Sequence, residues 1–101
     1  MIAIIYSWRI KPEYEAQFIA GWSETTEYYL RNFGALGSRL HKGNNDLWYG
    51  YAQWKSAEDR DSAFLDRANL RSRDMMKEAI EESFPEIVTE IKADFLIYPK
   101  K

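Results

Sequence analysis

The spacing of apolar residues changes along the chain, and each change marks a predicted element. Residues 2–10 carry apolar side chains on both faces of an extended chain, which is typical of a strand covered on both sides. After Lys11-Pro12-Glu13 the apolar residues fall at spacings near four, which predicts a helix that Gly34 ends. The apolar stripe of this helix comprises Phe18, Trp22, Thr25 or Thr26, Tyr29 and Phe33.

Two short strands and a tight turn follow that helix. Residues 36–41 and 47–54 are the predicted strands, and the polar stretch between them, Gly43-Asn44-Asn45-Asp46, is typical of a hairpin turn. We expect Asn44 and Asn45 to form the loop, so that the two strands run antiparallel.

The second half of the chain predicts two helical segments and a last strand. Ser56, with Asp59 three residues later, is typical of a helix cap, and residues 70–83 predict a further helix that Pro85 ends. Residues 87–97 predict the final strand. The order indicates a single domain, residues 1–101, of the α+β class. Its expected fold is a ferredoxin-like βαββαβ sandwich, in which a four-stranded antiparallel sheet carries its helices on one face.

The other face of the sheet predicts a partner. Residues 2–10 and 47–54 offer large side chains to both faces, Tyr49 and Tyr51 among them. An exposed apolar sheet face of several hundred Å² would be a liability in a monomer. The simplest arrangement is a two-fold homodimer whose sheets pack face to face.

The composition of the chain excludes several classes of function. The net charge is −2, with 14 basic residues scattered among 16 acidic ones, so no basic footprint for nucleic acid is present. The chain has no cysteine and one histidine, which excludes disulfides and multi-histidine metal sites and favours a cytoplasmic location. The first ten residues have no signal-peptide pattern, and no apolar run approaches the roughly 20 residues of a membrane span. Aromatic residues make up 16% of the chain, enough for some to line an interface or a cavity.

The expected hairpin register brings a set of unusual residues together. It places His41 opposite Trp48, Arg39 opposite Gly50, and Gly37 opposite Ala52. Directly opposed residues share a face of the sheet, so small residues would lie between Trp48 and Trp54 and leave a hollow with aromatic walls. The hollow would touch the only histidine and an arginine. The alternative is that Phe18 and Trp22 from the first helix fill the space as ordinary core residues.

The stretch GSRLHKG…DLWYGYAQWKS, which follows a helix rich in aromatic residues, resembles the antibiotic biosynthesis monooxygenase (ABM) superfamily of small dimeric α/β-barrel proteins. The likeness covers nearly the whole chain in length and element order. Its most specific piece is YAQW with the Lys-Ser that follows, at the end of the third predicted strand.

The resemblance implies particular site residues. In the polyketide-quinone-forming oxygenases of the family, a tryptophan that matches Trp54 and a histidine that matches His41 contribute to a substrate pocket. An arginine of the family is matched by Arg73, with a shift of one residue, or by Arg71. A family asparagine is replaced here by Gly50 and a family tyrosine by Arg60, so the pocket is implied but the anthrone substrate is not. The haem-degrading branch is not matched, because no histidine follows His41.

These residues suggest a chemistry without cofactor. A deprotonated, electron-rich arene can itself pass an electron to O₂. The protein then needs a base, a cation as charge partner for the phenolate, and an aromatic pocket that excludes water. His41 is the predicted base and Arg73 or Arg39 the charge partner. The predicted substrate-binding residues are Trp54, Trp48, Gly50, Trp22, Phe18 and Arg39.

Two functions follow from the sequence. The first is a cofactor-independent monooxygenase-like enzyme that oxidises a small aromatic or quinol-type compound with O₂. The second is a non-catalytic dimer that binds a hydrophobic small molecule or serves as a stress or regulatory module. Retention of His41 and Trp54 favours the enzyme, whereas Gly50 in place of the family asparagine favours the binder. His41 as an ordinary solvated residue and Arg39 as a solvated or inter-subunit charge are the simpler interpretations of those side chains.

Overall fold

The computed structural model describes residues 1–66 and 70–97 as an antiparallel sheet with three helices. The first half contains β1 (Ile2–Ile10), a 3₁₀ turn (Pro12–Tyr14), α1 (Glu15–Asn32), β2 (Gly37–Lys42) and β3 (Trp48–Trp54). The second half contains α2 (Ala57–Phe64), α3 (Arg71–Ala79), β4 (Ile80–Ser83) and β5 (Ile87–Glu90). The Ser56 side chain accepts a hydrogen bond from the Asp59 N–H at 3.2 Å, as predicted for the cap of α2.

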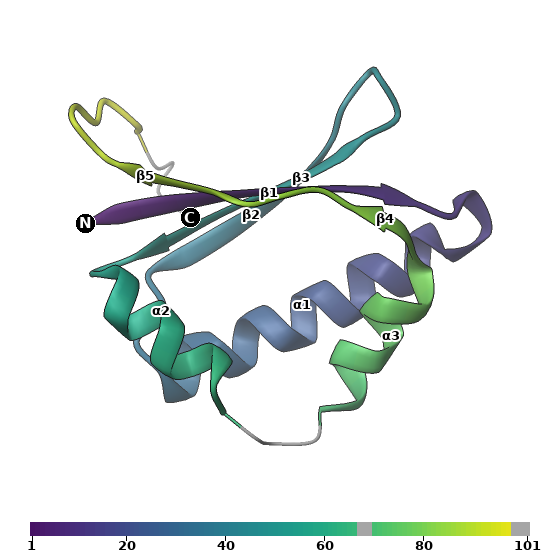
Figure 1. Ribbon diagram of the computed structural model, residues 1–101, viewed down its shortest axis with the longest axis horizontal. Helices are drawn as coiled ribbons and strands as arrows, with labels where there is room; N and C mark the ends of the chain where they lie inside the picture. Colours follow the sequence, from purple (N-terminus) through teal and green to yellow (C-terminus); the bar gives the residue numbers. More distant parts are fainter. Residues whose placement is uncertain (67–69, 98–101) are drawn as a thin grey trace.

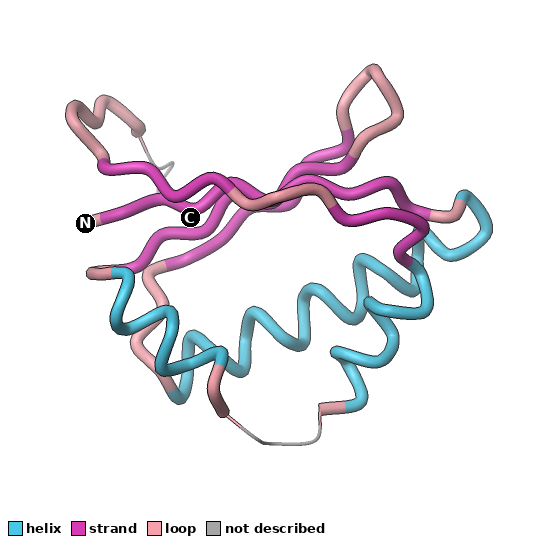
Figure 2. The backbone as a smooth tube through the Cα atoms, in the orientation of Figure 1, coloured by secondary structure: helices cyan, strands magenta, loops and turns pink. Residues whose placement is uncertain are grey.

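The sheet has the strand order β2-β3-β1-β4, and β5 also pairs with β1. β4 lies along Trp8–Ile10 and β5 along Ile2–Ile5, so the two form one interrupted outer strand beside β1 (Figures 1 and 2). All three helices cover the same face, and the described part of the chain leaves the other face bare (Figure 1). The predicted ferredoxin-like α+β fold is confirmed, and the sheet is open rather than closed.

The core lies between the sheet and the helices in two clusters. One contains Ile10, Phe18, Trp48 and Ala79, and the other contains Ile4, Trp54 and Ala63. α1 and α3 pack closely at Gly21, where an added Cβ would lie 2.7 Å from the carbonyl oxygen of Ser72. Glycine is therefore required at this helix contact.

Two predicted elements end earlier than expected. The helix predicted over 70–83 ends at Ala79, because residues 80–83 extend and pair with β1. The strand predicted over 87–97 ends at Glu90. Its partner β1 begins at Ile2, which already pairs with Glu90. Beyond that pair the Ile91 N–H still donates to the Met1 carbonyl at 3.4 Å, and the residues after Ile91 have no strand of this sheet to bond.

The hairpin register predicted from Asn44 and Asn45 is wrong by one residue. The loop has three residues, because Asp46 adopts a left-handed conformation (φ 63°) and the Gly43 N–H donates to the Leu47 carbonyl at 2.7 Å. His41 therefore lies opposite Tyr49, and Leu40 opposite Gly50.

A one-residue slip moves every side chain of a strand to the other face. Arg39 and His41 thus share a face with Tyr49 and Tyr51, away from the helices. On the helical side of β2 the structure places Ser38 and Leu40. The predicted register had placed Gly37, Arg39 and His41 on that side.

Candidate functional site

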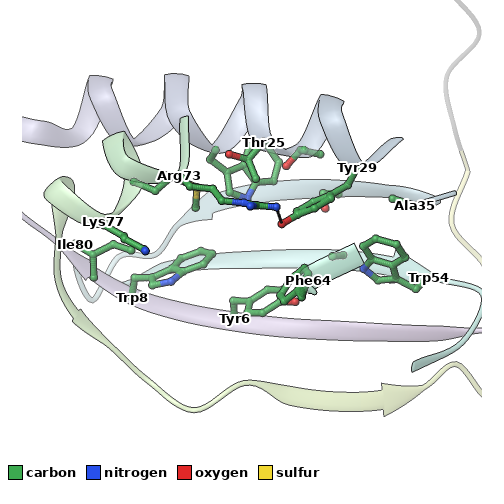
Figure 3. Close-up of a pocket in the computed structure, with 15 residues that line it drawn as sticks. Tyr6, Trp8, Thr25, Tyr29, Ala35, Trp54, Phe64, Arg73, Lys77 and Ile80 are labelled. Atoms are coloured by element: carbon green, nitrogen blue, oxygen red, sulfur yellow. Dashed lines mark hydrogen bonds between the residues drawn. The ribbon is translucent and has the colours of Figure 1, made fainter. Parts of the chain in front are cut away.

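A pocket of about 310 Å³ lies between the sheet and the helices (Figure 3). This volume is within the range of small-molecule sites. Its aromatic wall consists of Tyr6, Trp8, Trp22, Tyr29, Trp54 and Phe64. The other lining residues are Thr25, Thr26, Ala35, Ser38, Ala52, Arg73, Met76, Lys77 and Ile80.

Trp54 is both a core residue and a wall of the pocket. β3 ends there, and the side chain is 2% exposed because it packs with Ile4 and Ala63. Its ring centroid lies 6.1 Å from that of Tyr29 on α1. Trp54 therefore holds the end of the sheet against the helices and presents a fixed aromatic surface to the cavity.

The hollow expected along β3 is present at Ala52 but not at Gly50. Ala52 lines the pocket. Above Gly50 the space is occupied by Trp8 of the neighbouring strand, because an added Cβ would lie 2.8 Å from Trp8 Cη2. The Trp8 ring is stacked on Tyr6 with centroids 5.8 Å apart. An indole from β1 thus covers Gly50, the position at which the resemblance implies an asparagine.

Gly50→Ala is expected to destabilise the protein by about 1–3 kcal/mol, because the new methyl group overpacks the core against the Trp8 ring. The measurement is urea unfolding followed by tryptophan fluorescence. In a Trp8→Leu background the same substitution should cost much less. An equal cost in both backgrounds would mean that Trp8 is not the obstacle.

Arg73 places a cation beside Tyr29. The Arg73 Nη2 donates to the Tyr29 hydroxyl at 2.8 Å, and the guanidinium lies 5.5 Å from the centroid of that ring. Figure 3 shows this hydrogen bond across the middle of the pocket. Of the two arginines that the sequence left open, Arg73 lines the pocket, whereas Arg71 is exposed and is not among the lining residues.

A second arginine polarises a second tyrosine. The Arg60 Nη1 donates to the Tyr6 hydroxyl at 3.3 Å and also bonds the Glu86 carboxylate, and Nε donates to Asp61 at 2.8 Å. Burial by itself would lower the pKa of Arg60, but the hydrogen bonds to Glu86, Asp61 and Tyr6 raise it above its ordinary value. Arg60 therefore stays charged and holds the Tyr6 ring in place.

Burial raises the pKa of Tyr6 above its ordinary value of 10.0, and the hydrogen bond from Arg60 acts in the opposite direction. Tyr6 is thus a neutral phenol at physiological pH. Its oxygen already accepts from Arg60, so its own O–H proton is available to a ligand in the pocket.

The raised pKa of Tyr6 predicts a loss of stability in alkali. Between pH 10.0 and the folded-state pKa the unfolded chain loses the Tyr6 proton and the folded chain keeps it. The free energy of unfolding must then fall as the pH rises through this window. Urea unfolding of Tyr6→Phe should show a shallower alkaline decline than the wild type. Superimposable pH profiles would contradict this assignment.

The other predicted site residues lie elsewhere. His41 is exposed on the bare face of the sheet, in a separate depression with Tyr51, Gln53 and Leu96. Arg39 lies at the edge strand, and Phe18 is fully buried between Trp8 and Trp48. The structure therefore brings together Trp54, Trp22 and Arg73, and it separates His41 from them.

Tyr6, Trp8 and Tyr29 were missing from the predicted site, although the sequence held a signal for each. Tyr6 and Trp8 share the alternate positions of β1 with Ile4, on the helical side. Tyr29 belongs to the apolar stripe of α1. Sequence spacing could place all three on the correct faces, but it could not show that Arg60 reaches the Tyr6 hydroxyl or that Arg73 reaches the Tyr29 hydroxyl.

The described residues contain neither a metal-binding cluster nor a membrane-spanning helix. Residues 1–66 and 70–97 contain no group of three or more His, Cys, Asp or Glu side chains placed to hold a metal ion. Within the same ranges, every helix is too short or too polar to span a bilayer.

No family model and no curated protein sequence matches the chain. Several solved structures do match the chain in fold. SnoaB, a cofactor-independent oxygenase from Streptomyces nogalater, superposes with a TM-score of 0.77 at 12% identity, over 92% of this chain and 94% of SnoaB. A protein from Bordetella bronchiseptica assigned as an antibiotic biosynthesis monooxygenase gives a TM-score of 0.72 at 25% identity, over 91% and 96% of the two chains.

A third protein, from Nitrosomonas europaea and assigned in the same way, gives a TM-score of 0.75 at 16% identity, over 92% of this chain and 100% of its own. These likenesses agree with the resemblance in the stretch from Gly37 to Ser56. The chain therefore has the fold of the antibiotic biosynthesis monooxygenase superfamily, and that predicted resemblance is confirmed.

Proposed function

We propose that the chain is a cofactor-independent monooxygenase-like enzyme that oxidises a small aromatic or quinol-type compound with O₂. The observation that carries the proposal is the pocket itself, where an aromatic wall surrounds two tyrosine hydroxyls, each held by an arginine. The fold shared with SnoaB, a cofactor-independent oxygenase, supports the same reaction class.

The reaction balances without an external reductant. A phenolic substrate with an activated methylene group loses a proton and passes electrons to O₂. Oxidation of the methylene to a carbonyl removes four electrons, which reduce O₂ completely. One oxygen atom becomes the carbonyl oxygen, and the other leaves as water with the two methylene hydrogens.

The pocket residues would favour the anionic form of the substrate. Tyr6 and Tyr29 can each donate an O–H to a phenolate oxygen, and the Arg73 charge stabilises that oxygen in a site of low dielectric. Tyr29 is also near enough to Tyr6 for the two phenols to interact electrostatically. Trp54 and Trp22 offer ring faces that orient the substrate. In this proposal the acidity of the bound phenol replaces the base that the sequence assigned to His41.

The enzymatic test is oxygen uptake with a dihydroxyanthrone and a panel of hydroquinones, with a metal chelator present. Turnover should survive chelation, and isotopically labelled O₂ should appear in the product carbonyl. Tyr29→Phe keeps the ring and removes the hydroxyl, so kcat/KM should fall about tenfold or more.

The matched control is His41→Ala. It should leave kcat/KM within about twofold, because the imidazole lies on the other face of the sheet. A loss of about tenfold in His41→Ala would restore the sequence-based assignment and contradict this one.

The second candidate is a non-catalytic module that binds a hydrophobic small molecule. It is favoured by the absence of any carboxylate or imidazole among the described residues that line the pocket. Saturable binding of the same compounds without enzyme-dependent oxygen uptake would support it. For either function we propose a cytoplasmic location, because a chain without cysteine gains nothing from an oxidising compartment.

We also propose that the chain is a homodimer formed through the bare face of the sheet. Ile87 on that side is 58% exposed, and Phe95 beyond β5 is 90% exposed. Large apolar side chains exposed on a sheet face are normally covered by a partner. Sedimentation equilibrium should give twice the mass of the chain, and a single-chain mass at micromolar concentration would refute the proposal.

A further inference from the structure

The wall of the pocket is positively charged. Among the described residues that line it, two are basic, Arg73 and Lys77, and none is acidic. Both come from α3, where Arg73, Met76 and Lys77 follow one another at the spacing of a single helical stripe. The face of a helix that lines a cavity is normally apolar, so two cations on this face of α3 require an explanation.

Lys77 lies at one end of the pocket. It is exposed, yet its side chain lines the cavity, and Figure 3 shows its amine directed inward at the end where Trp8 and Ile80 lie. A cation in the last turn of a helix is favourable for the helix dipole. The dipole alone does not require the amine to turn toward the cavity.

Three neighbouring acids are engaged elsewhere. Glu78 accepts a hydrogen bond from Gln17 at 3.2 Å, and Glu81 and Glu82 both lie 3.7 Å from Arg9. In the part of the chain that the structure describes, Lys77 has no ion pair or side-chain hydrogen bond. Its charge is therefore available to a ligand.

We propose that the pocket takes an aromatic acid, with the ring against the aromatic wall and the carboxylate at the Lys77 amine. The proposal deepens the proposed function, since it concerns the ligand class of the same pocket. A carboxylate accepts a charge-assisted hydrogen bond from the ammonium group, and Arg73 adds to the same positive field. A neutral aromatic of the same shape would fill the same walls but lose this bond.

The test compares naphthoate with naphthamide by isothermal titration calorimetry at neutral pH. The two compounds have the same ring and nearly the same shape and differ in charge, and neither is oxidised by O₂. The wild type should bind naphthoate about fivefold more tightly or better, and Lys77→Gln should lower that ratio by about threefold or more. Lys55→Gln, which removes an equal charge from an exposed residue outside the pocket lining, should leave the ratio unchanged.

A wild-type ratio below about fivefold, no binding of either compound, or a fall of less than about threefold in Lys77→Gln would each overturn the proposal. An equal fall in Lys55→Gln would do the same, because it would indicate a general charge effect. The measurement is independent of turnover. Loss of the charge preference with oxygen uptake intact refutes only this inference, whereas charge preference without oxygen uptake refutes only the enzymatic function.

Discussion

Replacing Phe18 with alanine is expected to lower the free energy of unfolding by about 3–5 kcal/mol. Phe18 is 0% exposed, and its ring packs edge-on against two tryptophan rings. Its centroid lies 5.2 Å from that of Trp8 and 5.8 Å from that of Trp48. Truncation removes these contacts and leaves a cavity at the centre of the larger core cluster. The total free energy of unfolding of a domain of this kind is about 5–15 kcal/mol, so the variant would be marginally folded. Urea unfolding followed by circular dichroism measures the loss.

The neighbouring residue provides the control for Phe18. Ile19 is exposed, so Ile19→Ala should cost less than about 1 kcal/mol. Phe18→Leu keeps most of the volume and should retain both the fold and ligand affinity. If Phe18→Leu folded normally but lost affinity for naphthoate, Phe18 would be the substrate-binding residue that the sequence predicted.

Replacing Ala52 with phenylalanine is expected to abolish ligand binding while the protein remains folded. Ala52 lines the pocket on the helical side of β3, opposite Ile4 and Ser38. A phenyl ring there would enter the cavity of about 310 Å³ and occupy the space beside Trp54. The loss of affinity for naphthoate should be about 100-fold or more, since ligand and side chain compete for one volume. Calorimetric titration measures the affinity.

The matched control is the same substitution at an exposed helical position. Ala20 on α1 faces solvent, so Ala20→Phe should leave the affinity unchanged. Because filling a cavity often stabilises a protein, the midpoint of urea unfolding in Ala52→Phe should stay close to that of the wild type. Normal affinity in folded Ala52→Phe would show that the ligand binds elsewhere.

The fold was predictable because its signals are local and repeated. Apolar residues at spacings near four marked α1, and the polar stretch Gly43–Asp46 marked the hairpin. The Ser56 cap was found because a capping hydrogen bond involves residues only three apart. These features depend on neighbours in sequence, so they survive in any tertiary context.

The site was less predictable because its geometry depends on single residues. One left-handed residue, Asp46, lengthened the hairpin loop and moved His41 and Arg39 to the bare face. The Trp8 ring, which fills the space above Gly50, comes from another strand of the sheet. The contact from Arg60 to Tyr6 spans 54 residues, and no spacing rule reaches that far.

The end of α3 was mispredicted for a tertiary reason as well. Residues 80–83 have charges at 81 and 82 that suit an exposed helical turn. In the folded chain, β1 offers its outer edge at Trp8–Ile10, and backbone pairing there prevails over helix propensity.

The most direct measurement of the pocket is an NMR map of naphthoate binding on the ¹⁵N-labelled protein, with indole resonances assigned by single Trp→Phe variants. The pocket described above predicts that the largest shifts fall on the indole N–H groups of Trp8 and Trp54 and on the backbone around Ala52 and Arg73. Shifts gathered instead around Arg39, His41 and Tyr51, with the Trp54 indole unmoved, would place the ligand on the bare face of the sheet and contradict this account.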